Sequence, residues 1–287
     1  MIYWKEYQGH KEDETIYTFD IETTSYIILD GKQYEPIKYL DFDKKTQEKC
    51  QFQAFMYIWQ FGINETVYYG RTWQEFVSFL EKLEYYTKNS KKICFVHNLS
   101  FEFEFMRNCL KFKDVYARKS RKVMKCTLQD FNIEFRCTLF MSNLALKKLP
   151  QVYNLPVEKL VGDLDYNIIR HNKTKLNKKE LKYCENDCLV VYEYIKRELE
   201  KYKKIKKIPL TYTGHVRKEL KNKIFMNFKY KHKVKKSINI DGHFFDLMQR
   251  SFSGGYTHAN YVYADEIIKE VDSFDETSAY PYVMVTR

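Results

Sequence analysis

The sequence has no apolar run approaching the roughly 18 residues that a membrane-spanning helix needs. Its start, MIYWKEYQGHKEDE, lacks the apolar segment of a secretion signal. Both absences predict a protein without a membrane partner that stays in a cytoplasm, the host's if the source is a virus. Internal repeats are absent too, and the only biased tract is lysine-rich. The length of 287 residues with 44% hydrophobic content predicts a globular protein of one large domain, or one domain plus part of another.

Cysteine is sparse and scattered. The seven cysteines are odd in number and diluted in a long chain, which argues against a disulfide framework and for free thiols. Cys184 and Cys188 stand one helical turn apart and could share a metal ion, but no second Cys/His pair has ligand spacing. Two half-buried helix thiols is therefore the better interpretation.

Acidic residues are nearly missing from one stretch. From Lys201 to Lys236 there are fourteen Lys/Arg residues against a single acid, Glu219, in a chain of net charge +11. Aromatic residues such as Tyr212 and Tyr230 are interleaved with the cations. This pattern suits a surface that neutralises phosphates and stacks bases. A solvated lysine-rich connector is the alternative.

Hydrophobic periodicity predicts an α/β fold, because strands come first and helices are interspersed among later strands. The predicted helix 101–110 has Phe105, Met106, Cys109 and Leu110 inward, and the helix 177–199 begins with Asn177 as a cap. The predicted strands are 14–24, 52–61, 65–70, 92–97, 123–128 and 131–137, and the predicted helices are 73–86, 101–110, 142–152 and 177–199.

Asp20 and Glu22 are two residues apart on a predicted strand, so both side chains point to one face. Two-metal hydrolysis of a phosphodiester needs several carboxylates that converge from different elements. A shared divalent ion would remove the penalty of two adjacent acids on a largely apolar strand. An exposed polar face explains most such pairs when they are taken alone.

Three further residues are candidates for the same site. Glu102 lies where the strand 92–97 hands over to a helix, although an acid in the first helical turn is also favoured by the helix dipole. Tyr183 and Asp187 share one helix face, so the phenol could orient a water beside the carboxylate. Ordinary amphipathic helices also carry such pairs.

Taken in order, FDIETT, HNLSFE and YCENDC resemble the three exonuclease motifs of the DEDDy superfamily. The segments KKLP at 147–150 and GDLDY at 162–166 are similar to the stretch between the second and third motifs in protein-primed family B DNA polymerases of phages and linear plasmids. SFSGGYTHAN resembles the Y-x-G-G signature that joins exonuclease and polymerase portions, and FDETSAYP resembles polymerase motif A.

The resemblance implies an RNase H-like exonuclease domain over residues 1–199, a basic connector over 200–250 and the start of a polymerase palm over 251–287. The implied function is 3′→5′ proofreading on single-stranded DNA, within a polymerase that also binds primer-template DNA and a terminal protein primer. A stand-alone DEDDy nuclease and a catalytically inactive DNA-binding fragment remain the alternatives.

The resemblance also assigns roles to individual residues. The four acids and the tyrosine above would be catalytic, the acids holding two Mg²⁺ or Mn²⁺ ions, and residues near the three motifs would hold the frayed 3′ end. By role, the implied residues are Asp20, Glu22, Glu102, Asp187 and Asp275 for metal ions, Tyr183 for the attacking water, Thr23, Asn98, Phe101, Thr138, Leu139, Phe252, Gly254 and Gly255 for DNA, and Tyr280 for the incoming nucleotide.

This sequence departs from the family pattern in several places. Glu102 stands where the second motif has Asp, with Glu104 as a less favoured substitute, and Phe252 replaces the tyrosine of Y-x-G-G. Val161 occupies the place of a catalytic lysine, for which Lys159 is the nearest candidate. The later polymerase motifs B and C are missing, so we expect this chain alone not to polymerise DNA, and to be part of a longer polypeptide or to work with a second one.

Overall fold

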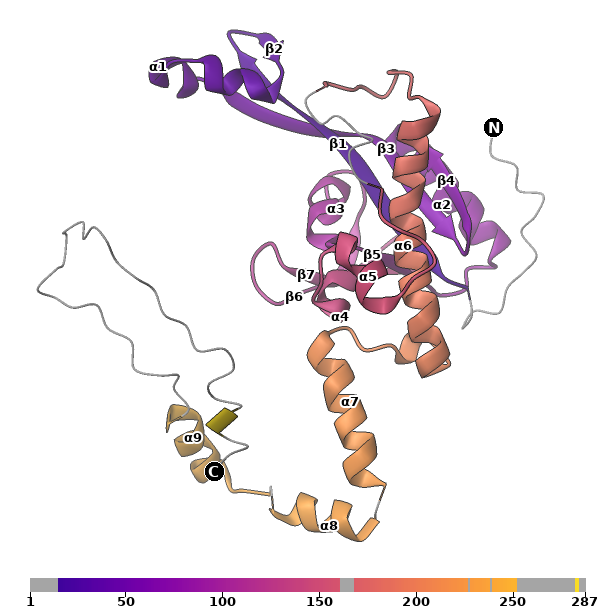
Figure 1. Ribbon diagram of the computed structural model, residues 1–287, viewed down its shortest axis with the longest axis vertical. Helices are drawn as coiled ribbons and strands as arrows, with labels where there is room; N and C mark the ends of the chain where they lie inside the picture. The colour runs from indigo at the N-terminus through magenta and orange to yellow at the C-terminus, as the bar shows by residue number, and fades with distance from the viewer. Residues whose placement is uncertain (1–14, 161–167, 227, 238, 252–281, 284–287) are drawn as a thin grey trace, which may run out of the picture. The chain divides into compact units, whose positions relative to one another are not determined.

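The computed structural model describes residues 15–160, 168–226, 228–237, 239–251 and 282–283. Eight strands in this described part form one mixed sheet, in the order β4-β3-β1-β5-β8-β7-β6, with β2 paired to β1 (Figure 1). The strands are β1 (Tyr17–Leu29), β2 (Lys32–Tyr34), β3 (Gln51–Ile63), β4 (Thr66–Gly70), β5 (Lys92–Val96), β6 (Phe112–Ala117), β7 (Val123–Leu128) and β8 (Ile133–Cys137).

Strand directions divide the sheet into two parts. β4, β3 and β1 form an antiparallel meander, and β6, β7 and β8 form another. The central pairs β1–β5 and β5–β8 are parallel. Parallel strands are usually covered on both faces, and β5 is buried along its whole length.

Two short helices cover one face of the sheet. α2 (Trp73–Tyr86) begins with a capping box of Thr72 and Glu75, and α3 (Leu99–Met106) follows β5 directly. Alternation along β1 sends Tyr17, Phe19 and Ile21 into the core beneath these helices. Each fully buried side chain of this size stabilises the fold by roughly 1.5–3 kcal/mol.

The long helix α6 (Lys178–Tyr202) covers the opposite face (Figure 1). Its capping box of Asn177 and Glu180 forms as the sequence predicts, because each side chain bonds the other's backbone N–H. The predicted stripe is buried at Cys184, Cys188 and neighbouring positions, in contact with β1, β3 and β5. All seven cysteines are free thiols, as predicted.

Two expectations of helical structure are wrong. The predicted helix 142–152 is instead α4 (Thr138–Ser142), η2 (Leu146–Lys148) and α5 (Leu149–Tyr153), because Asn143 adopts a left-handed conformation that ends α4. Helix α3 ends at Met106, four residues earlier than predicted, and Cys109 is exposed rather than inward.

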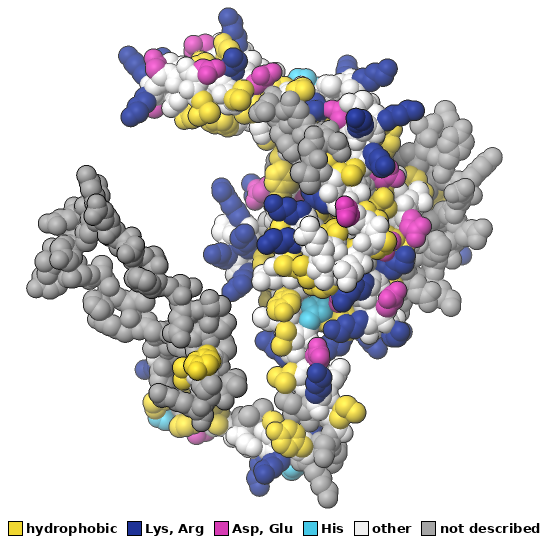
Figure 2. All heavy atoms as spheres, viewed as in Figure 1, with side chains coloured by type: hydrophobic (Ala, Val, Ile, Leu, Met, Phe, Trp, Pro, Cys, Tyr) yellow, Lys and Arg dark blue, Asp and Glu magenta, His cyan; other side chains and the backbone are white. Residues whose placement is uncertain are grey.

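The far ends of β1 and β3 leave the core together and form an arm with β2, η1 (Pro36–Asp41) and α1 (Lys44–Gln47). Figure 1 shows the arm projecting beyond the helices that flank the sheet, and Figure 2 shows hydrophobic side chains along its lower edge. Ile37, Leu40 and Phe52 are each more than half exposed there. Hydrophobic periodicity does not predict the arm.

Helices continue after α6, with η3 (Ile205–Lys207), α7 (Tyr212–Phe225), α8 (Phe228–Ser237) and α9 (Gly242–Ser251). Contacts divide the chain into two units, residues 1–223 and residues 224–287. Among the described residues, no helix has the length and apolar character to cross a membrane. The assignment of functional domains at residues 199 and 250 stays a prediction.

Candidate active site

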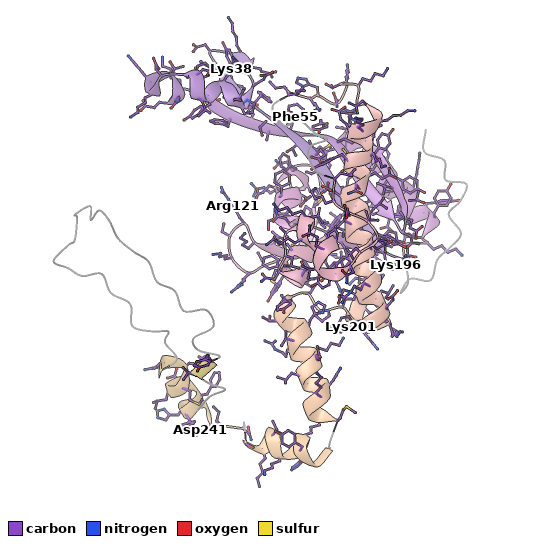
Figure 3. The ribbon with its side chains drawn as sticks, viewed as in Figure 1. Lys38, Phe55, Arg121, Lys196, Lys201 and Asp241 are labelled. Atoms are coloured by element: carbon purple, nitrogen blue, oxygen red, sulfur yellow. The ribbon has the colours of Figure 1, made fainter. Side chains whose placement is uncertain are left out.

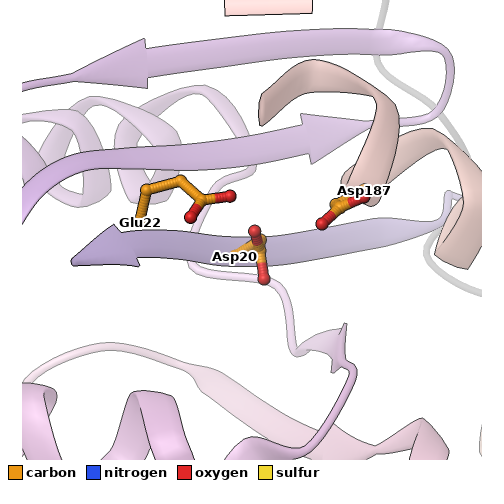
Figure 4. A group of neighbouring side chains, drawn as sticks. All are labelled: Asp20, Glu22 and Asp187. Atoms are coloured by element: carbon orange, nitrogen blue, oxygen red, sulfur yellow. The ribbon is translucent and has the colours of Figure 1, made fainter. Parts of the chain in front are cut away.

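Three carboxylates from two elements converge at the centre of the sheet. Asp20 and Glu22 lie on β1, and Asp187 lies on α6, which crosses the same face. One carboxylate oxygen from each lies within 4.8 Å of the others, and Figure 4 shows the three groups pointing toward one another. Glu22 and Asp187 are buried, and Asp20 is half-buried. The structure thus brings together three of the four acids that the sequence predicts for this site.

Glu102 lies in the first turn of α3 and is not among the three residues within 4.8 Å, but its charge adds to burial and to the charges of Asp187 and Glu22 in raising the pKa of Asp20. The residue is 3% exposed, and its Oε2 has no hydrogen-bond partner within the described part of the chain. Glu104 instead forms a surface ion pair with Arg107, at 3.0 Å. Of the two acids that the sequence offers, Glu102 therefore fits the site.

The carboxylates repel one another in a buried environment. Burial and the charge of Asp187 raise the pKa of Glu22 to about 8, against the lowering effect of Lys159 and Arg170. Burial, followed by the charges of the other acids, raises the pKa of Asp20 well above its ordinary value. Burial also raises the pKa of Glu102 and of Asp187. Such a group favours a bound cation, which would relieve the repulsion.

Lys159 supplies one positive charge. Its Nζ donates to Oδ1 of Asp187 at 2.7 Å and to Oδ2 at 2.5 Å. The same ammonium lies 3.4 Å from the hydroxyl of Tyr183 and 4.9 Å from the centre of its ring. Lys159 therefore joins the phenol to the carboxylate.

Arg170 is a second cation that acts on Glu22, opposing the rise in its pKa that burial causes. Arg170 donates through Nε and Nη2 to Glu180, at 3.1 and 2.8 Å, and its backbone N–H donates to the hydroxyl of Thr24 at 3.2 Å. These bonds fix the segment that follows residue 167 against β1. Sequence reasoning missed Arg170, because no local pattern places a residue of this loop beside the strand that carries Glu22.

The predicted DNA-binding residues differ in exposure. Asn98 and Phe101 are exposed at the start of α3, where Asn98 has a left-handed conformation with φ 64°. Thr23 and Leu139 are half-buried. Thr138 is fully buried, and its Oγ1 lies 3.0 Å from Nδ1 of His97, so its burial does not favour direct contact with DNA.

The other predicted residues of the polymerase portion lie outside the described residues, and their roles stay predictions. They are Phe252, Gly254, Gly255, Asp275 and Tyr280.

The donor set at the acidic group fits divalent metal ions. Mg²⁺ and Mn²⁺ prefer oxygen ligands, and the four carboxylates offer oxygen alone. The unpartnered Oε2 of Glu102 and the raised pKa values are what uncompensated ligands would show. Asp20, Glu22, Glu102 and Asp187 can therefore hold such ions.

The mixed sheet flanked by helices is the α/β fold that the sequence predicts, and comparison with solved structures confirms this fold class. The chain is similar to Phi29 DNA polymerase complexed with single-stranded DNA, with a TM-score of 0.58 and 16% identity over 88% of this chain. It is also similar to the same polymerase complexed with primer-template DNA and incoming nucleotide substrates, with a TM-score of 0.56 and 16% identity over 90% of this chain. The chain spans 42% of the length of each, and at this identity the likeness shows the fold alone.

A family model matches part of the sequence. Residues 162–287 match the family described as DNA polymerase type B, organellar and viral. This match supports the resemblance to a family B polymerase that the motifs predict. No curated protein sequence matches the chain.

Proposed function

We propose that this chain carries a 3′→5′ exonuclease site that removes nucleotides from single-stranded DNA, as the front portion of a protein-primed type B DNA polymerase. The observation that supports it best is the convergence of Asp20, Glu22 and Asp187 within 4.8 Å, with Glu102 beside them. The order of these acids along the chain follows the exonuclease motifs, and the fold is that of the Phi29 polymerase.

Two divalent ions held by the four acids would neutralise the phosphodiester and lower the pKa of an attacking water. The residues of the chain position the reactants around them. Lys159 holds the hydroxyl of Tyr183 beside Asp187. There the hydroxyl can accept a hydrogen bond from a water or donate one to it. The exposed ring of Phe101 offers a face on which the terminal base can stack.

Proofreading also needs the strand to reach the site from a polymerase. The lysines between 201 and 236 would hold phosphates of the strand, and Asp275 and Tyr280 would take part in synthesis once the rest of a palm is supplied. A terminal protein primer and a downstream polymerase portion are the further partners that we propose for it.

The test is digestion of a 3′-labelled single-stranded oligonucleotide by the purified chain in Mg²⁺ and in EDTA. We expect loss of the label in Mg²⁺ alone, and none with Asp20→Ala/Glu22→Ala. Glu102→Ala should be inactive, whereas the matched control Glu104→Ala should cleave normally because Glu104 pairs with Arg107 at the surface. Equal cleavage by the Asp20/Glu22 variant would refute the assignment. If the chain also digests a labelled RNA oligonucleotide in Mg²⁺ at the same rate, the result would favour a stand-alone nuclease of broader substrate range.

A further inference from the structure

A pocket of about 400 Å³ opens where the arm joins the sheet. β4 ends at Gly70 opposite Trp59, so within the described strands no partner covers the edge of β3 that precedes Trp59. The start of α2 and the loop 168–174 border this free edge. Figure 3 shows Phe55 at this junction, between the arm and the upper end of α6. The volume lies in the range of small-ligand sites.

The walls of the pocket are aromatic. Tyr26, Phe55, Trp73 and His171 line it, and the rings of Phe55 and His171 stack with their centres 5.2 Å apart and their planes 20° apart. His171 is exposed and Trp73 is half-exposed, so both rings keep surface for a planar ligand.

Among the polar groups that line the pocket are three side-chain amides. Gln33, Gln74 and Asn172 line it, and none of these side chains forms a hydrogen bond within the described part of the chain. A side-chain amide carries two donors and an acceptor, which is the complement of a nucleobase edge. Aromatic faces combined with such groups are how proteins hold unstacked bases.

The pocket is held in shape by Arg71. Its Nε donates to the carbonyl of Tyr57 at 2.6 Å, and its two Nη atoms donate to the carbonyls of Thr174 and His171, each at 2.9 Å. These bonds anchor the loop 168–174 against β3 and keep the His171 ring on Phe55. The walls are therefore organised before any ligand arrives.

The pocket lies on the strand that carries the acidic group. Tyr26 follows Glu22 by four residues of β1, roughly 13 Å at the rise of a strand. Thr24 between them bonds the same loop that lines the pocket, through the N–H of Arg170. A single strand whose 3′ end lies at the carboxylates can reach the pocket within a few nucleotides.

We propose that this pocket binds one unpaired nucleobase of the DNA strand whose 3′ end occupies the acidic site, an inference that rests on the proposed exonuclease function. The base stacks on His171 and Trp73, and the amides of Gln33, Gln74 and Asn172 hold its edge. A paired base cannot enter, so the pocket favours a frayed strand over a duplex.

The test is equilibrium binding of an eight-nucleotide oligothymidine to the full chain carrying Asp20→Ala/Glu22→Ala, which prevents cleavage. We expect His171→Ala or Trp73→Leu to weaken binding roughly 5- to 150-fold, the loss that follows from removing one base stack. The matched control Tyr85→Leu alters an exposed aromatic residue at the far end of the same helix as Trp73 and should bind within twofold of the parent. Circular dichroism of each variant confirms folding.

A single abasic nucleotide moved along the oligonucleotide locates the bound base. We expect one internal position to lose affinity in the parent chain and no such position with His171→Ala. Unchanged affinity of both pocket variants, or no sensitive position in the parent, would overturn the proposal. Thymidine monophosphate binding as tightly as the oligonucleotide would overturn the assignment to a strand. Cleavage by the unmodified chain is measured separately, so a failure of the exonuclease assignment is distinguishable from a failure of the pocket.

Discussion

Removing charge from the acidic site should stabilise the metal-free protein while abolishing cleavage. In Asp20→Asn/Glu22→Gln the side chains keep their size, but the repulsion within the acidic group falls. Glu22 has a pKa of about 8 in the folded chain against 4.5 ordinarily, a difference of about 3.5. At about 1.4 kcal/mol per pKa unit, neutralising Glu22 alone has a ceiling of about 5 kcal/mol above pH 8.

We expect about 1–3 kcal/mol, because the amides that replace the carboxyl groups also carry a desolvation cost in this buried site. The size of this stabilisation depends on pH. Between pH 4.5 and 8 the folded protein keeps a proton on Glu22 that the unfolded chain has released, so stability falls as pH rises through this window. The double variant lacks this loss, and its advantage over the unmodified protein should grow from pH 5 to pH 8.5.

Thermal unfolding in EDTA at these two pH values measures the effect. A gain of about 1–3 kcal/mol corresponds to a rise of roughly 2–12 °C in Tm for a chain of this size. Mg²⁺ should raise the Tm of the unmodified protein at pH 8.5 and leave that of the variant unchanged. An advantage of equal size at pH 5 and pH 8.5, or a variant less stable at both, would refute the electrostatic reasoning.

Three further outcomes are expected. Lys159→Met should slow single-turnover cleavage roughly 100-fold or more without unfolding the chain, because the ammonium holds Tyr183 and Asp187 together; a Lys159→Met variant that cleaves at the normal rate would contradict this. Burial and nearby lysines lower the pKa of His215 to about 4 from 6.5, so the folded protein binds fewer protons than the unfolded chain and stability is lost as pH falls from 6.5 to 4. His215→Gln lacks this group, so across that window its free energy of unfolding should fall by about 1–2 kcal/mol less than that of the unmodified protein. Denaturant titrations at the two pH values measure the difference. The logarithm of the affinity for single-stranded DNA should fall linearly with the logarithm of salt concentration, and replacing four cations between Lys201 and Lys236 by Gln should lower the magnitude of the slope by about 3; an unchanged slope would exclude phosphate contacts there.

Local pattern predicted the elements whose periodicity is strong. Helix α2 occupies the predicted residues 73–86, and α6 begins at the predicted Asn177 cap, because apolar spacing and cap chemistry are both encoded locally. The break after Ser142 was missed because the left-handed Asn143 interrupts an otherwise helical pattern. The arm was not predicted because its short helices have no row of buried side chains that would give a periodic pattern.

The acids of the candidate site were predictable from the sequence, but only one of its two cations was. Asp20, Glu22, Glu102 and Asp187 lie in short motifs, so each could be named before its neighbours were known. Lys159 could be named from the family resemblance, whereas Arg170 comes from a segment without a periodic pattern and is identified by tertiary contacts alone. Glu102 and Glu104 could be separated only by the structure, which pairs Glu104 with Arg107.

Helix α6 is one unbroken element of 25 residues, so its two ends move together. Asp187 lies near its middle, and Glu198, eleven residues later, contacts His215 of α7 at 3.4 Å. The two acids are roughly 16 Å apart along the axis, so a tilt of ~2° about the far end displaces the carboxylate by ~0.5 Å. Catalytic geometry tolerates about that much. Through helix α6, a partner that fixes the position of the basic helix α7 would therefore also affect the alignment of the acidic site.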